Sequence, residues 1–307
     1  MPATRIRRRA LELAALLGAT LALSACGAAT TTGGSGTIPV VAAQNFWGSI
    51  VAQLGGNRVS VTSIVTDPNA DPHEYETSAA DARAFADASY VVLNGAGYDT
   101  WAQKLLDANP ASGRAVLTVA GALGRQPGDD PHFWYSPDDV KTIADHITAD
   151  LTSIAPARSA YFAAQRTVFE SALAPYHQLI TSIRTRYAAT PVGATESIFV
   201  YLASALGLDL ISPPAFMQAV AEGNDPPVQA VATMRDQVRS RSIAVLVYNV
   251  QTVTVVTTGL QQLAGTSGVA VVGISETMPP SYATFEDWQV AQLTAMQHAL
   301  AGARSGA

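Results

Sequence analysis

Two histidines stand in the same tripeptide, Asp-Pro-His, at residues 71–73 and 130–132. A chance repetition of this tripeptide within one half of a chain is not expected. The proline before each histidine restricts the backbone and stiffens the loop. The neighbouring carboxylates could orient each imidazole through its second nitrogen, as is usual for metal-binding histidines. The pair predicts that His73 and His132 bind one metal ion, whereas either histidine alone would be interpreted as an ordinary surface or core residue.

Two carboxylates in the second half of the chain could complete such a site. Glu196 follows a predicted strand and begins a helix, and Glu276 follows the last predicted strand. Ligands of open α/β sheets bind beyond the carboxyl ends of the strands, where both side chains are expected. Position alone leaves other roles open, because a carboxylate also stabilises a helix N-terminus and is common in a solvated loop. Asn45 and Tyr248, at other strand ends, are candidate hydrogen-bond donors to the ligands.

Short β-branched segments alternate with helical patterns along most of the chain. The alternation predicts an α/β fold with two similar lobes, each a mostly parallel four-stranded sheet flanked by helices. The predicted strands are residues 38–43, 59–65, 90–94 and 115–119 in the first lobe, and 191–195, 208–211, 243–249 and 269–274 in the second. The clearest predicted helices are residues 137–154, 198–206, 227–239, 253–263 and 284–301.

A segment without glycine, residues 157–189, separates the two sets of strands. Its apolar residues recur at near-helical spacing and predict one long helix that joins the lobes. Pro175 has no N–H to donate and would disturb the helical ladder, which leaves two shorter helices as the alternative. We therefore expect an N-terminal lobe over residues 38–155, a linking helix over 156–190 and a C-terminal lobe over 191–304.

The N-terminus has the pattern of an export signal. Four arginines precede an apolar run, residues 11–23, that is too short to span a bilayer comfortably. The order Leu-Ser-Ala-Cys-Gly at residues 23–27 is that of a bacterial lipobox. It predicts a signal peptide over residues 1–25, lipidation of Cys26 and a flexible tether over residues 26–37.

The charge balance is acidic, with 24 Asp and Glu against 18 Lys and Arg in 307 residues. Four arginines and Glu12 lie in the predicted signal, so 14 basic and 23 acidic residues remain, a net charge near −9. This balance argues against nucleic acid as a partner and suits the capture of cations. The single cysteine excludes an internal disulfide.

The two Asp-Pro-His motifs, the long central helical segment and residues 195–202 (Thr-Glu-Ser-Ile-Phe-Val-Tyr-Leu) carry a resemblance. Together they resemble the metal-binding (cluster A) substrate-binding proteins of ABC importers, a family of zinc and manganese receptors, over nearly all of the mature chain. The resemblance implies that one divalent ion is held between the lobes by His73, His132, Glu196 and Glu276. Glu286 and Asp287 are alternative late carboxylates, although they fall within the final helical pattern.

The implied cargo is Zn²⁺ or Mn²⁺, with Fe²⁺ as a further alternative. Zinc receptors of the family often have a third histidine in the cleft and a His-rich loop, whereas this chain has Glu196 and a short loop at residues 124–130. These departures favour manganese. However, most N/O sites bind Zn²⁺ more tightly than Mn²⁺, so affinity need not identify the physiological ion.

The resemblance further implies an extracytoplasmic receptor, not an enzyme, that is anchored to the membrane through Cys26 and delivers its ion to an ABC permease. We expect a monomer. A binding protein for haem or a siderophore is the alternative, since such proteins use a similar two-lobed fold. A zinc-dependent hydrolase is less well supported, because the chain contains neither H-E-x-x-H nor G-x-S-x-G.

Overall fold

The computed structural model describes residues 36–69 and 72–305. Thr37–Ala307 form a compact unit of their own. The predicted signal peptide, Cys26 and most of the predicted tether lie outside the described residues. Within the described ranges, no helix combines the length and the apolar character needed to cross a membrane.

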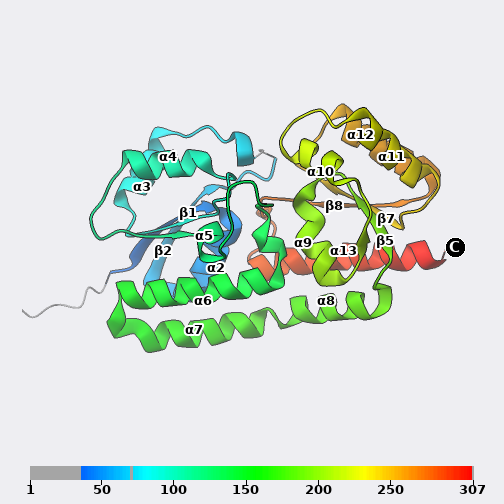
Figure 1. The fold of residues 1–307 in the computed structure, drawn as a ribbon. Coiled ribbons are helices and arrows are strands. Elements are labelled where there is room, and N and C mark those ends of the chain that lie inside the picture. Colours follow the sequence, from blue (N-terminus) through cyan, green and yellow to red (C-terminus); the bar gives the residue numbers. More distant parts are fainter. Residues whose placement is uncertain (1–35, 70–71, 306–307) are drawn as a thin grey trace, which may run out of the picture. The chain divides into compact units, whose positions relative to one another are not determined.

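The N-terminal lobe is built on a parallel sheet with the strand order β2-β1-β3-β4 (Figure 1). Its elements are β1 (Ile38–Gln44), α2 (Asn45–Gly55), the 3-10 turn η1 (Gly56–Arg58), β2 (Val59–Val65), η2 (Pro72–Glu74), α3 (Ala79–Asp87), β3 (Tyr90–Leu93), α4 (Thr100–Ala108), β4 (Ala115–Thr118), α5 (Val119–Ala122), η3 (Phe133–Tyr135) and α6 (Pro137–Ile154). Successive side chains of a strand point to opposite faces. Along β1, Val40 therefore joins the core under α2 and α6, whereas Val41 joins the core under α3 and α4.

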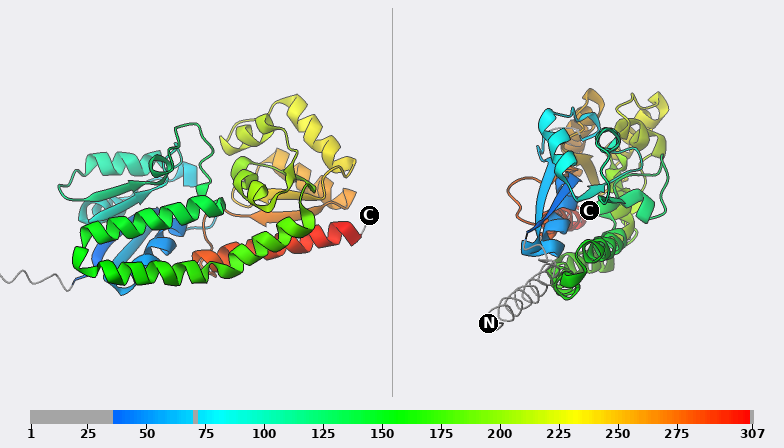
Figure 2. Two further views of the ribbon diagram at one scale, coloured as in Figure 1. Left: turned by 60° about the horizontal axis from the view of Figure 1, so that its bottom comes forward. Right: turned by 90° about the vertical axis from the view of Figure 1, so that its left-hand side faces the viewer.

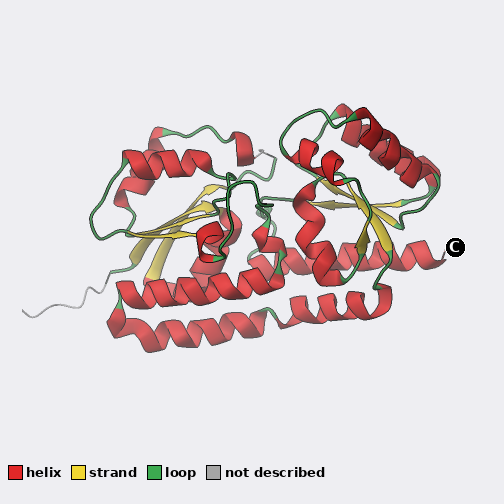
Figure 3. Cartoon of the chain, viewed as in Figure 1, coloured by secondary structure: helices red, strands yellow, loops and turns green. Residues whose placement is uncertain are grey.

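The C-terminal lobe repeats this plan with the strand order β6-β5-β7-β8, again all parallel. Figure 3 shows the strands of both lobes flanked by helices. Its elements are β5 (Pro191–Ala194), η5 (Ser197–Phe199), α9 (Val200–Leu206), β6 (Asp209–Leu210), α10 (Pro214–Ala221), α11 (Val228–Arg239), β7 (Val245–Asn249), α12 (Val255–Ser267), β8 (Ala270–Ile274) and α13 (Phe285–Ser305). Along β7, Leu246 joins the core under α11 and α12, whereas Val245 and Val247 face α9 and α13. The predicted α/β fold of two similar lobes is confirmed.

The strand bounds agree with the predicted ones to within two residues at each end. The sequence prediction did not include α10, which begins with Pro214 in its first turn, a position where the missing N–H costs nothing. Both sheets are covered by helices on their two faces, as the nearly continuous apolar runs of the central strands require.

The long linking segment is helical and is interrupted at one residue, Leu173, between α7 (Ser159–Ala172) and α8 (Ala174–Tyr187). A short 3-10 turn, η4 (Pro156–Arg158), leads into it from α6. Pro175 stands in the first turn of α8, where a proline is tolerated. Figure 2 shows these helices running along one side of both lobes, with α13 packed against α8.

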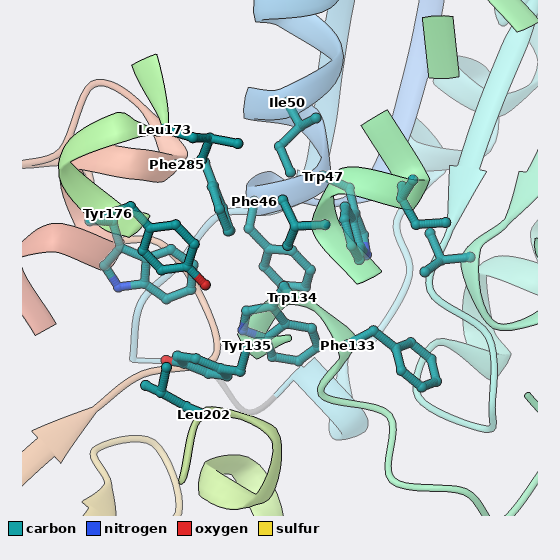
Figure 4. Packing of buried hydrophobic residues seen from close by; sticks show 14 of the residues in the cluster. Phe46, Trp47, Ile50, Phe133, Trp134, Tyr135, Leu173, Tyr176, Leu202 and Phe285 are labelled. Carbon is teal, nitrogen blue, oxygen red and sulfur yellow. The ribbon is translucent and has the colours of Figure 1, made fainter. Parts of the chain in front are cut away.

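One hydrophobic cluster continues from the N-terminal lobe into the C-terminal lobe. At its centre the ring of Phe46 stacks on Trp134 with centroids 4.1 Å apart. Figure 4 shows this cluster, in which Tyr176 of α8 and Phe285 of α13 lie near the aromatic residues of α2 and η3. The lobes are therefore joined by a shared core as well as by the linking helices.

Candidate metal centre

The four candidate ligands stand on loops that follow the carboxyl ends of strands. His73 lies in η2 after β2, and His132 lies just before η3, after β4 and α5. Glu196 comes between β5 and η5, and Glu276 follows β8. Because the strands within each sheet are parallel, such loops emerge at one edge of that sheet. Each lobe thus contributes two candidate ligands at its carboxyl edge.

The structure brings these four side chains together across the two lobes. His73 Nε2 lies 3.6 Å from Glu276 Oε2, and His132 Nε2 lies 3.8 Å from Glu196 Oε1. One ligand atom from each of His73, His132 and Glu276 falls within 4.8 Å of the others. Asn249 connects the fourth residue to the group, because its amide donates to Glu196 Oε2 at 2.9 Å and to Glu276 Oε1 at 2.6 Å.

Three of the four side chains are buried. The side chains of His132, Glu196 and Glu276 are 0%, 1% and 1% exposed, whereas that of His73 is 29% exposed. His132 Nε2 and Glu196 Oε1 have no hydrogen-bond partner among the described residues. Buried polar atoms nearly always have a hydrogen-bond partner, so these two atoms, 3.8 Å apart, are candidate ligands for a cation that would contact both.

Asp130 orients the His132 ring. Its Oδ1 accepts from the backbone N–H of His132 at 3.1 Å and lies 2.6 Å from the ring Nδ1. Since a carboxylate only accepts, the proton of this contact belongs to Nδ1, and Nε2 is the nitrogen turned to the site. Tyr201 donates to the backbone carbonyl of Asp130 at 3.0 Å, which ties this loop to α9 of the other lobe.

The electrostatics of the site favour a cation. Burial lowers the pKa of His132, but the adjacent Asp130 carboxylate and then Glu276 and Glu196 outweigh it and raise the pKa to about 9. Burial, followed by the charge of Glu276, raises the pKa of Glu196 to about 7. Without a metal, protons on His132 and partly on Glu196 therefore offset the buried negative charge. A divalent ion would replace those protons.

Three further residues hold the ligands, and the sequence reasoning did not select them. The Tyr98 hydroxyl donates to Glu276 Oε2 at 2.6 Å across the lobe boundary. Gln251 Oε1 accepts from the backbone N–H groups of Glu276 at 2.6 Å and of Thr277 at 3.0 Å. The third is Asn249. Their one shared sequence signal, a position at or after the end of a strand, applies to many polar residues.

The two donors that the sequence suggested lie elsewhere. Asn45 bonds the main chain of Met278, donating to its carbonyl at 2.7 Å and accepting from its N–H at 3.0 Å. Tyr248 points to the opposite face of β7 from its neighbour Asn249, and its ring lies against Gly273. Because side chains alternate between the two faces along β7, Asn249 faces the ligands and Tyr248 does not.

The alternative late carboxylates also lie apart from the ligand group. Glu286 Oε2 accepts from Gln53 Nε2 at 2.9 Å, which places it against α2 at the start of α13. In the ranges that the structure describes, the group of close ligand atoms contains neither Glu286 nor Asp287.

A cavity of about 410 Å³ leads to the two imidazoles. His73, Tyr98 and His132 line it from the N-terminal lobe, and Ser197, Val200 and Met217 line it from the C-terminal lobe. The site is therefore open to solvent on the side of His73, which gives an ion a path to the buried ligands.

Residues 40–299 match the family described as zinc-uptake complex component A, periplasmic. The chain belongs to this family. The resemblance to metal-binding substrate-binding proteins of ABC importers is thereby confirmed, and with it an extracytoplasmic, metal-binding class of protein.

Among curated relatives, the chain is 27% identical to the manganese-binding lipoprotein MntA of Halalkalibacterium halodurans over 62% of this chain and 66% of that protein. It is 24% identical to the zinc-binding lipoprotein AdcA of Streptococcus pneumoniae, over 64% of this chain and 42% of that protein.

Solved structures share the fold. The periplasmic zinc-binding protein TroA of Treponema pallidum superposes with a TM-score of 0.73 at 15% identity, covering 86% of this chain and 99% of that one. A manganese-bound periplasmic metal-binding protein of Candidatus Liberibacter asiaticus gives a TM-score of 0.70 at 21% identity, covering 85% and 98%.

Proposed function

We propose that this protein captures one divalent transition metal ion, Zn²⁺ or Mn²⁺, between its lobes and delivers it to the permease of an ABC importer. The observation that carries the proposal is that two buried atoms without a hydrogen-bond partner, His132 Nε2 and Glu196 Oε1, face each other at 3.8 Å. Beside it, His73 Nε2 lies 3.6 Å from Glu276 Oε2, which also accepts from the Tyr98 hydroxyl.

The donor set and its spacing fit a divalent ion. Two neutral imidazoles and two carboxylates balance a charge of +2 and suit Zn²⁺, Mn²⁺ or Fe²⁺ better than an ion that prefers thiolates. A tetrahedral Zn²⁺ with bonds of about 2.1 Å holds its ligand atoms about 3.4 Å apart. The separations of 3.6 and 3.8 Å between imidazole nitrogens and carboxylate oxygens need to shorten only slightly.

Calorimetric titration tests the site. We expect the metal-stripped unit Thr37–Ala307 to bind one Zn²⁺ or Mn²⁺ per chain, and His73→Ala and Glu196→Ala each to weaken binding by more than about 100-fold. His146→Ala is the matched control, because His146 is exposed on α6, and it should bind like the unmodified chain. No binding, or binding that neither site variant changes, would reject the metal site and favour haem or a siderophore.

An anchor would keep the protein close to the permease, and we assign this role to lipidation of Cys26 and the tether over residues 26–37. A diacylated cysteine provides two chains, enough for stable anchoring. The Cys26→Ser chain should appear in the soluble fraction of cells after membrane fractionation, whereas the unmodified chain should sediment with membranes. Sedimentation of both alike would remove the anchor from the proposal.

A further inference from the structure

Asn249 occupies the position between the two carboxylates. It is the last residue of β7 and is 1% exposed. Its Nδ2 donates to Glu196 Oε2 at 2.9 Å and to Glu276 Oε1 at 2.6 Å, with Thr252 Oγ1 a third acceptor at 3.0 Å. Its Oδ1 accepts from the backbone N–H of Gln251 at 3.0 Å. This last bond fixes the orientation of the amide, so the NH₂ group must face the carboxylates.

In each carboxylate, one oxygen accepts a hydrogen bond from Asn249 and the other faces an imidazole. One oxygen of Glu196 and one of Glu276 accept from Asn249. The other oxygen of each faces an imidazole, at 3.8 Å for Glu196 and at 3.6 Å for Glu276, whose oxygen also accepts from the Tyr98 hydroxyl at 2.6 Å. An amide donor between two buried carboxylates also reduces the cost of placing like charges side by side.

The main chain that carries Glu276 is held as firmly as its side chain. Gln251, two residues beyond Asn249, accepts from the N–H groups of Glu276 and Thr277 and donates to Thr277 Oγ1 at 3.1 Å. Gln251 therefore holds the backbone of Glu276, and Asn249 holds its carboxylate. A carboxylate held at both points has little freedom to rotate and offer its second oxygen.

We propose that Asn249 is a positioning residue that restricts each carboxylate to one ligating oxygen and thereby favours Zn²⁺ over Mn²⁺. This inference rests on the proposed metal site. With Asn249 in place, the protein offers four donors, two imidazole nitrogens and two carboxylate oxygens, which is the number that Zn²⁺ takes. Without it, both carboxylates could bind through two oxygens and offer up to six donors, the coordination that Mn²⁺ prefers.

The test compares the affinities of the full chain for Zn²⁺ and Mn²⁺, by competition titration, before and after Asn249→Ala. We expect the ratio of the two affinities to shift towards Mn²⁺ by about tenfold, a usual size for a residue that supports ligands. The visible absorption of bound Co²⁺, intense for four ligands and weak for six, should fall in the same variant.

Asn45→Ala is the matched control. Asn45 is also a buried asparagine just past the end of a strand, and it bonds the same loop at Met278 without touching a carboxylate. It should lower the melting temperature, as we also expect for Asn249→Ala, but leave the affinity ratio and the Co²⁺ spectrum unchanged. If Asn249→Ala does not fold, Asn249→Ser, whose hydroxyl has a single hydrogen to donate, should show a smaller shift in the same direction.

The outcomes separate the inference from the function on which it rests. An unchanged affinity ratio in the Asn249 variants, or an equal shift in Asn45→Ala, would overturn the role of Asn249 while leaving the metal site in place. Failure of the unmodified chain to bind either ion would overturn both.

Discussion

At the scale of single residues, the site is a balance between buried negative charge and the protons that compensate it. His132 is held between Asp130, which contacts its Nδ1, and Glu196, which faces its Nε2. Its raised pKa means that in the metal-free protein the imidazole keeps a proton, which an ion bound at the proposed site would displace. Metal capture at the proposed site would therefore exchange protons for a divalent ion.

We predict that metal binding at pH 7.5 releases about one proton per ion. The pKa of His132, about 9 in the metal-free protein, lies above this pH, so the ring is protonated before binding and must lose its Nε2 proton to ligate. Glu196, with a pKa of about 7, adds a smaller release. Calorimetric titration in two buffers of different ionisation enthalpy measures the number of protons directly.

Asp130→Asn supplies the comparison for this prediction. It removes the carboxylate that most raises the pKa of His132, so the ring should be largely neutral at pH 7.5 and the proton release should fall. Equal proton release by both proteins would show that His132 is not the group that the metal deprotonates.

At the scale of elements, the turn η3 and the loop after β8 place ligands of different lobes against each other. Tyr135, three residues after His132, donates to the carbonyl of Ser275 at 2.7 Å and to Gln292 Oε1 at 2.9 Å. Ser275 directly precedes Glu276, and its N–H donates to the same Gln292 oxygen at 3.1 Å. Helix α13 thus supplies the acceptor that both ligand-bearing segments share.

We predict that Tyr135→Phe lowers the free energy of unfolding by about 1–3 kcal/mol, because it removes the buried hydroxyl that donates to the carbonyl of Ser275. Urea denaturation of the metal-free chain measures this loss. Tyr161→Phe should cost less than about 0.5 kcal/mol, since its hydroxyl makes an exposed bond with the N–H of Asn57. Equal losses in the two variants would mean that the shared acceptor on α13 does not stabilise the boundary between the lobes.

At the scale of the whole molecule, the two lobes are joined by helices, by a shared hydrophobic core and by direct hydrogen bonds. The linking helices run along both lobes, and one aromatic cluster continues from α2 to α13. Hydrogen bonds also cross the boundary directly, including the bond from Phe285 N–H to Ser49 Oγ at 2.9 Å. Large rotation of one lobe against the other would break this shared core.

We predict that the radius of gyration of Thr37–Ala307 changes by less than about 1 Å when the metal binds, as for partners whose backbone moves little on binding. Small-angle X-ray scattering of the metal-free and metal-loaded unit measures it. Loop movement around the cavity beside His73 is compatible with this result. A larger contraction would instead indicate hinge closure of whole lobes and contradict the restraint by α7, α8 and α13.

Local patterns in the sequence were enough to determine the two-lobed α/β fold, the bounds of most strands and the helical link. They succeed because alternation along a strand and near-helical spacing are set by residues close in the chain. The break at Leu173 required the structure, since Pro175 was compatible with either a kink or two helices. The proposed lobe boundaries and the ligation by the four candidate ligands remain predictions.

The sequence by itself also selected His73, His132, Glu196 and Glu276, through a repeated motif and a family resemblance, but only the tertiary structure decided that they meet. The bond between Tyr98 and Glu276 joins residues 178 positions apart, and those between Asn45 and Met278 join residues 233 apart. No local pattern encodes such contacts, because they arise from the packing of one lobe on the other. The contacts of Asn249 could not be predicted for the same reason, because they form only when two loops bring Glu196 and Glu276 to the end of β7.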